Sequence, residues 1–413
     1  MLLALRHGTF RWLFAAQVAS AFGNFAFTVA VAALLVEHGA GAGAGTIGTV
    51  LAVQAFGLVL FAVPAGVIAD RFPRRLVCVA ADLARMGAVA TIAVIGGGAS
   101  TGVIAALAFV VGMGEALFEP AFRGLMPRVL PDDLLQSGNA LAALSSQLAL
   151  FLGPAISGIV IATAGARPAL AISAAIFALS WVGMLRVQEH IAEPPTGEHP
   201  GEASALSEAA EGFRAIWARP WIAIVVATAM IHVLVLIAPF EVLAPLTAEG
   251  EYGDVAVYGW MLAALGAGAI IGAVVAARIR PRLPGVLSLL LLIPFCVLMV
   301  ALAVVPSVPV LLTVIFVTGF GEATFEVLWT TAVQRDVPDH LLSRVISIDF
   351  LGSLALLPIG LALVGPAVDA FGREEVLISG AIVSFVLIFP PMLSGQVRRL
   401  SSREVVTREG VQE

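Results

Sequence analysis

The chain reads Gly114-Glu-Ala-Leu-Phe-Glu-Pro-Ala-Phe-Arg-Gly-Leu-Met-Pro-Arg-Val-Leu-Pro-Asp-Asp-Leu-Leu135, and 207 positions later it reads Gly321-Glu-Ala-Thr-Phe-Glu-Val-Leu-Trp-Thr-Thr-Ala-Val-Gln-Arg-Asp-Val-Pro-Asp-His-Leu-Leu342. Ten of the 22 positions are identical when the two stretches are aligned without gaps. Because this offset is close to half of the 413 residues, the chain is predicted to consist of two related halves.

The composition indicates a membrane protein. Hydrophobic residues make up 60% of the chain and charged residues 12%, with a mean hydropathy of +1.02, which is far too apolar for a soluble globular protein. The first apolar run, Trp12 to Val36, is too long for the core of a secretory signal and is followed by no suitable cleavage site, so we expect no such signal. Cys78 and Cys296 lie in apolar segments and are interpreted as small buried hydrophobes.

Twelve apolar segments are long enough to cross a bilayer, which takes about 20 helical residues. The expected spans in the first half are Trp12–Val36, Thr46–Ala69, Leu76–Gly96, Gly102–Leu125, Leu134–Ala162 and Pro168–Leu185. Those in the second half are Trp221–Leu246, Val255–Ala277, Leu283–Val304, Val308–Ala332, Ser343–Val368 and Val376–Leu393. The sequence therefore predicts an all-α membrane protein with twelve transmembrane helices in two six-helix halves.

The arginines predict the sidedness. In this topology nineteen arginines fall on one side, only Arg167 and Arg373 fall opposite, and Arg85 lies inside a helix. This bias places both termini in the cytoplasm of a multi-pass cell-membrane protein. Because six helices per half is an even number, the halves are parallel repeats. The expected parts are residues 1–186 and 221–397 as six-helix bundles, 187–220 as a cytoplasmic linker, and 398–413 as a cytoplasmic tail.

Several functions are excluded by what the sequence lacks. All 22 basic residues are arginine, so the chain has no Walker A lysine for ATP hydrolysis and no lysine for a Schiff base. It has no G-x-S-x-G or H-E-x-x-H motif, and at a net charge of −6 it has no basic patch for nucleic acid. We expect no enzyme activity, no cofactor and no metal site, so that uphill work would use an ion gradient or a separate energising subunit.

A first family motif follows the second predicted helix, where the chain reads Gly66-Val-Ile-Ala-Asp70-Arg71-Phe-Pro-Arg74-Arg75. This resembles the G-x-x-x-D-R-x-x-R-R signature of the major facilitator superfamily. The resemblance implies a cytoplasmic gate in which Asp70 and the arginines form a charge network, with Gly66 allowing close helix approach. A topogenic arginine cluster would also explain the arginines, but not the spacing of Gly66 and Asp70. The matching loop of the second half, Gly272 to Arg282, lacks the aspartate.

Two further stretches resemble branches of the superfamily. Gly153-Pro154-Ala-Ile-Ser157-Gly158 is similar to the end of the G-P-x-x-G-G motif that kinks a helix in antiporters, although an ordinary proline-kinked helix is the alternative. The run from Leu125 to Leu141 resembles the helix-4/5 loop of the drug:proton antiporter-3 branch, which includes macrolide-efflux-like and enterobactin-exporter-like proteins.

The glutamates of the repeat are the main candidates for proton or substrate binding. Glu115 and Glu119 are four residues apart, so they share a helix face, and so do Glu322 and Glu326. The resemblance places both pairs on cavity-lining helices, 4 and 10. A charged side chain at the bilayer centre costs on the order of 2.5–3.5 kcal/mol, which makes such acids functional candidates. For Glu119 the alternative is an ion pair, in a gate or by itself, with Arg123.

Other polar groups in apolar segments are weighed individually. Glu241 follows Pro239 and could line the cavity or mark an irregular helix end, while Asn24 is a neutral amide where many relatives carry an acid. Asp82 and Arg85 are three apart and are expected to pair with each other. A lone histidine on an apolar helix is usually structural, so His232 is ranked below the glutamates.

The sequence thus predicts a secondary transporter, a proton-coupled antiporter that exports lipophilic or cationic small molecules such as antibiotics by alternating access. Its expected partners are a small-molecule substrate, protons and the lipid bilayer, and it is expected to be a monomer. Three alternatives stay open: export of a siderophore or metabolite, import by the same fold, and a membrane sensor or scaffold that transports nothing.

Overall fold

The structure, a computed structural model, describes residues 4–37, 43–188, 214, 216–217, 219–276, 278–279, 281, 283–337 and 356–393. Every regular element in these ranges is a helix, and none is a strand. Eleven helical segments are long and apolar enough to cross a membrane, and the apolar helix Leu356–Phe371 is shorter. The prediction of an all-α membrane fold is confirmed.

The first half begins with the short turn η1 (Ala4–Arg6). Its helices are α1 (Gly8–Glu37), α2 (Ala44–Arg71), α3 (Arg74–Ile95), α4 (Thr101–Val129), α5 (Asp132–Ala164) and α6 (Ala166–Arg186), with the turn η2 (Gly96–Gly98) after α3. Each contains one of the predicted spans, extended by several residues, except that α3 ends one residue before the predicted Gly96 and begins at Arg74. Side chains such as Val94 and Leu179 are 81% and 67% exposed, which is the surface that a lipid environment would cover.

The second half contains two spans assembled from pieces. The first joins α8 (Pro220–His232), the π-helix η3 (Val233–Ile237) and α9 (Ala238–Tyr252), and the second joins α11 (Pro284–Leu290) and α12 (Ile293–Val304). The remaining helices are α10 (Ala256–Ala276), α13 (Val308–Asp336), the helix Leu356–Phe371 and α15 (Arg373–Leu393). The first part of the predicted span Ser343–Val368 lies outside the described residues.

The internal repeat is visible in the packing of α4 and α13. Phe118 and Phe122 stack one turn apart on α4, with ring centroids 6.1 Å apart and planes inclined by 9°. Phe325 and Trp329 stand 207 positions later on α13 and stack in the same way, at 6.3 Å and 4°. This agreement shows that the duplicated sequence builds duplicated structure.

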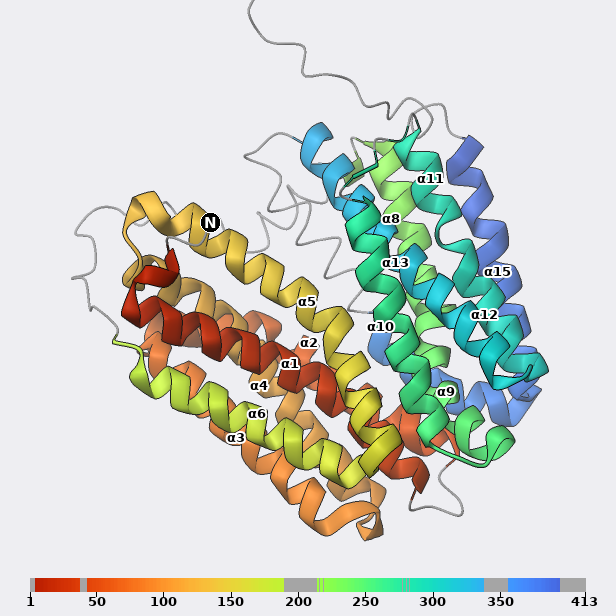
Figure 1. Ribbon diagram of the computed structural model, residues 1–413, viewed down its shortest axis with the longest axis horizontal. Coiled ribbons are helices and arrows are strands. Elements are labelled where there is room, and N and C mark those ends of the chain that lie inside the picture. Colours follow the sequence, from red (N-terminus) through yellow and green to blue (C-terminus); the bar gives the residue numbers. More distant parts are fainter. Residues whose placement is uncertain are drawn as a thin grey trace, which may run out of the picture.

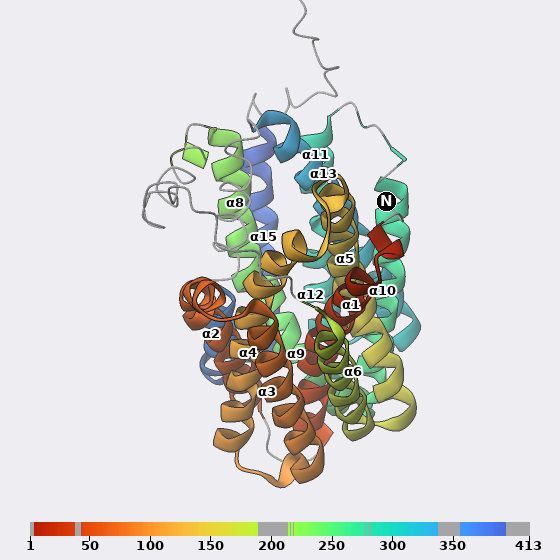
Figure 2. The same ribbon diagram turned by 90° about the vertical axis from the view of Figure 1, so that its left-hand side faces the viewer.

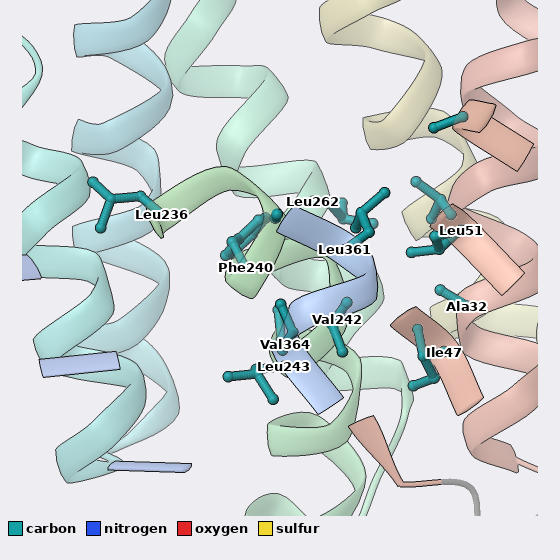
Figure 3. Close-up of a cluster of buried hydrophobic side chains, with 14 of the residues drawn as sticks. Ala32, Ile47, Leu51, Leu236, Phe240, Val242, Leu243, Leu262, Leu361 and Val364 are labelled. Carbon is teal, nitrogen blue, oxygen red and sulfur yellow. The ribbon is translucent and has the colours of Figure 1, made fainter. Parts of the chain in front are cut away.

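The two groups of helices meet at one end and separate toward the other (Figure 1). Figure 2 views the arrangement from the side of α1–α6, which lie in front of α8–α15. At the closed end Gly48 of α2 packs against the backbone of Leu361, and Gly365 packs against Gly45. Figure 3 shows the apolar cluster there, in which Ile47 and Leu51 face Val242, Leu361 and Val364.

Candidate functional site

A cavity of about 170 Å³ opens among α8, α13 and the junction between α11 and α12. Its wall is mainly apolar and aromatic and carries three titratable side chains. The lining residues are Ala229, His232, Val233, Ile237, Leu292, Glu322, Phe325, Glu326 and Trp329. Glu322 and Glu326 come from the second copy of the repeat, and their spacing of four residues places both on the face of α13 that lines the cavity.

His232 connects three helices around this cavity. Its side chain is only 4% exposed, and its Nε2 atom lies 3.4 Å from Glu322 Oε1. Its Nδ1 atom lies 3.1 Å from Ser384 Oγ of α15, and its ring packs edge-on against Phe295 of α12. Among the described residues, His232 Nε2 and Glu322 Oε1 are buried and lack a partner with hydrogen-bond geometry. The pair is therefore close enough to attract electrostatically when the imidazole is protonated, but each atom can still accept a new partner.

Glu326 lies one turn further along α13. The Thr330 hydroxyl is 3.3 Å from Glu326 Oε1, and Glu326 has a further interaction in the structure. Two carboxyl groups in a largely apolar wall can bind protons or the positive charge of a ligand, and Phe325 and Trp329 offer flat faces for an organic body.

The corresponding region of the first half is filled by a buried ion pair. Arg85 and Asp82 of α3 are both 0% exposed, and Arg85 Nη2 donates to Asp82 Oδ1 at 2.5 Å. Arg85 also donates to Ser20 Oγ at 2.8 Å and to Asn24 Oδ1 at 3.0 Å, both on α1. The Ser180 hydroxyl of α6 lies 2.6 Å from Asp82 Oδ2. The structure thus confirms the expected Asp82–Arg85 pairing and shows that Asn24 belongs to this network.

Gly114, which opens the first copy of the repeat, makes room for Arg85, because a Cβ atom at this position would collide with the Arg85 side chain. The next residue, Glu115, is partly buried and experiences the positive field of Arg85. Glu115 forms no hydrogen bond with any other residue that the structure describes. Glu119 pairs with Arg123 at 2.7 Å, and the two side chains are 42% and 77% exposed. The first pair of glutamates therefore differs from the second, because one member lies in an exposed ion pair.

Glu241 is the remaining acidic candidate and lies at the start of α9, three residues after Ala238. It is partly buried and interacts electrostatically with the buried Tyr258 of α10. Glu241 is not among the residues that line the cavity at His232.

Two arginines of the gate motif, at the start of α3, donate hydrogen bonds to backbone carbonyl groups of α2, α4 and α6. Arg74 donates to Gly124 O of α4 at 2.6 Å and to Ala69 O of α2 at 3.3 Å. Arg75 donates to Met184 O at 3.1 Å and to Leu185 O at 2.7 Å, both at the end of α6. Arg71 is exposed, and the Asp70 side chain lies outside the described side chains. A Cβ atom at Gly66 would meet no described atom within 4 Å, so the close approach predicted at Gly66 involves none of the described residues.

The antiporter-like motif lies where α5 meets both α1 and α10. Gly153 faces Phe25 of α1, and Ser157 donates to Ala26 O of α1 at 3.1 Å. Gly158 faces the backbone of Gly259 on α10, and Pro154 lies inside α5 between these contacts. The motif therefore contributes to the contact between the halves.

Sequence reasoning missed several polar partners. The roles of Ser20 and Ser180 could not be predicted, because a serine in an apolar helix gives no sequence signal of the group that it contacts. Ser384, which contacts His232, stands 207 positions after Phe177, whose ring packs on Arg85. The same offset leads from Arg85 to Leu292.

Comparisons with known proteins give a consistent result. Residues 2–409 match the model of a family described as transmembrane secretion effector, within the major facilitator superfamily. The multidrug efflux pump Tap of Mycolicibacterium fortuitum is 30% identical over 411 residues, covering 92% of this chain and 95% of Tap. The enterobactin exporter EntS of Shigella flexneri is 24% identical over 266 residues, or 62% of each chain. A solved structure of a nucleoside transporter NupG mutant has a TM-score of 0.72 at 12% identity, covering 93% of this chain and 99% of its own, which is a likeness of fold alone.

Proposed function

The chain belongs to the transmembrane secretion effector family of the major facilitator superfamily, and from this premise we propose that it exports lipophilic, cationic small molecules in exchange for protons. It is a membrane transporter and not an enzyme. The observation that carries the proposal is the cavity at His232, in which Glu322 and Glu326 share a wall with Phe325 and Trp329.

The chemistry of this wall favours an organic cation. A cation over an aromatic face gains roughly 0.5–2 kcal/mol, most when it is desolvated, and the adjacent carboxylates provide the opposite charge. An anionic cargo would need a cation instead. Among the described residues, Arg85 is the deeply buried cationic side chain, and its guanidinium already donates hydrogen bonds to Asp82, Ser20 and Asn24.

Protons are the natural coupling ion for this arrangement. The chain has no lysine for a nucleotide-binding loop. It therefore has no Walker A loop for ATP hydrolysis, and an ion gradient is the energy source that it can use by itself. Glu115 and Glu322 occupy equivalent positions in the two halves, and a carboxyl group in an apolar wall exchanges between a neutral protonated form and an ionised form that a cation stabilises. We assign both as proton or substrate sites.

The arrangement of the halves supports alternating access. The arginine bias places the termini in the cytoplasm, and with that orientation the closed end of the structure is the outer end. The conformation is then inward-facing. Rocking of the first six helices against the second six would close the inner end and expose the cavity outside.

Transport of a fluorescent lipophilic cation tests the proposal. Everted membrane vesicles that contain the protein are energised and given ethidium, with a pH-sensitive dye inside to report proton release. We expect ethidium uptake with dissipation of the pH gradient, and we expect Glu322→Gln and Glu115→Gln to abolish both at wild-type expression. Glu251→Gln is the matched control, because Glu251 lies in a partly exposed pair with Arg373. Unchanged uptake in both the Glu322→Gln and the Glu115→Gln variant would overturn the assignment of the proton sites.

Siderophore export is the second candidate, favoured by the similarity to an enterobactin exporter. In the same vesicles a catecholate siderophore should fail to compete with ethidium if the acidic cavity selects cations. Competition by the siderophore at a lower concentration than that of any cation tested would favour this alternative, and absence of flux for every compound would favour a sensor or scaffold.

A further inference from the structure

The cavity at His232 lies where the repeat places a charged side chain in the other half. In the first half, the Arg85 guanidinium lies over the ring of Phe118 at 4.8 Å and over the ring of Phe177 at 4.7 Å. The ring of Phe118 has a counterpart in Phe325, which lines the cavity. Glu115, which experiences the positive field of Arg85, has its counterpart in Glu322.

The residues that supply and hold this guanidinium are replaced in the second half. The positions 207 residues after Asp82, Arg85 and Phe177 carry Leu289, Leu292 and Ser384. Leu289 and Leu292 are 0% and 3% exposed, so both stay buried without a charge. Leu292 forms part of the cavity wall, and nothing in the described chain takes the place of the guanidinium. The second half thus keeps the acid and the aromatic face but lacks the cation between them.

We propose that this cavity is a subsite for the cationic head of the cargo, a guanidinium, amidinium or ammonium group, which occupies the place that the Arg85 guanidinium fills in the first half. This inference rests on the proposed function and names the part of the cargo that is recognised. A volume of about 170 Å³ is below the roughly 300–1,000 Å³ of pockets that enclose drug-sized ligands. The cavity therefore takes a head group, while the lipophilic body extends beyond it.

His232 is the resident competitor for this subsite. Of the described residues that line the cavity, it is the one that can carry a positive charge. It shares the cavity wall with Glu322 and Glu326 of α13, and its ring contacts Ser384 of α15 and Phe295 of α12. Protonated His232 would satisfy Glu322 by itself, whereas neutral His232 leaves that carboxylate for the cargo.

The subsite can be tested by direct binding, with the purified full-length protein and p-aminobenzamidine, a fluorescent aryl amidinium. We expect saturable binding at pH 8. Glu322→Gln should weaken binding at pH 8 by at least about tenfold, because the charge partner is lost. His232→Arg should also weaken it, because a permanent positive charge there would pair with Glu322 in place of the ligand, whereas His232→Gln should retain binding.

Leu292 provides a second, independent variant. Leu292→Arg puts a guanidinium at the position equivalent to Arg85 and should block binding, while Leu292→Met keeps the volume and should bind normally. A thermal melt of each purified variant separates loss of the subsite from loss of folding. Absence of saturable binding to the wild type would overturn the subsite, and so would binding by Glu322→Gln and Leu292→Arg that is as strong as that of the wild type. Ethidium transport that persists in that case would leave the proposed function standing, so the two failures are distinguishable.

Discussion

The backbones of Gly158 of α5 and Gly259 of α10 are in close contact where the two halves meet. A Cβ atom built on either residue would overlap the carbonyl oxygen of the other. Gly266 of α10 is held in the same way by Phe151 and Ala155 of α5. Small residues at these positions permit the close helix approach that closes this end of the molecule.

Enlarging Gly158 should therefore open the closed end. In Gly158→Val the side chain cannot fit against Gly259, so we expect the population to shift away from the conformation described here. Spin labels at Ser100 and Ser307, which are exposed in loops of opposite halves, should report a longer and broader distance distribution. Gly87→Val is the control, because a Cβ atom at Gly87 meets no described atom within 4 Å. An unchanged distribution in Gly158→Val would contradict the role of the glycine contact.

The buried Asp82–Arg85 pair gives a prediction about stability. Removal of one member leaves an uncompensated charge, so Asp82→Leu alone should lower the free energy of unfolding by about 3–5 kcal/mol. The double variant Asp82→Leu/Arg85→Leu reproduces the leucines of the second half and should recover most of this loss. Denaturant unfolding in detergent measures both. A double variant that is less stable than the single one would show that the hydrogen bonds to Ser20 and Asn24 dominate.

The arginines of the gate motif are expected to differ in their contribution to stability. Arg75 holds two carbonyl groups at the end of α6, so Arg75→Gln should cost about 0.5–1.5 kcal/mol of unfolding free energy. Arg71 is exposed, and Arg71→Gln should change the free energy of unfolding by less than about 0.5 kcal/mol. Thermal shifts of the two purified variants compare them directly, and an equal loss would contradict the capping role of Arg75.

The sidedness follows from the arginine bias and can be measured with single cysteines. Ser100→Cys and Ser307→Cys should react with a membrane-impermeant maleimide in intact cells, while Gln188→Cys should react only in everted vesicles. All three positions are exposed in the structure, and the native Cys78 and Cys296 are buried. The reverse pattern would place the termini outside and make the described conformation outward-facing.

The helices could be predicted because hydropathy and length decide them, but their interruptions could not. Pro239 lacks the N–H that would bond to the carbonyl of Val235, and the π-helix η3 covers that turn. Pro294 similarly follows the break between α11 and α12, where Gly321 packs against the Leu291 carbonyl. A hydropathy pattern treats both segments as continuous helices.

The site was predicted in part. Glu322 and Glu326, which line the cavity, could be singled out from the sequence because acids in apolar helices are rare. Asp82 could be expected to pair with Arg85 because they lie three apart on one helix. The contact between His232 and Glu322 depends on how α8 packs against α13, which no local pattern encodes. A single histidine on an apolar helix carries no sign of such a partner.

The central claim is that export of a cation is exchanged for protons at the acidic cavity. The most direct test is to reconstitute the purified protein in liposomes with an acidic lumen and to record ethidium uptake and lumenal pH together. We expect each addition of ethidium to raise the lumenal pH in step with uptake, and we expect neither change with Glu322→Gln. Ethidium uptake without any proton movement, or an unaltered coupling in Glu322→Gln, would contradict the claim.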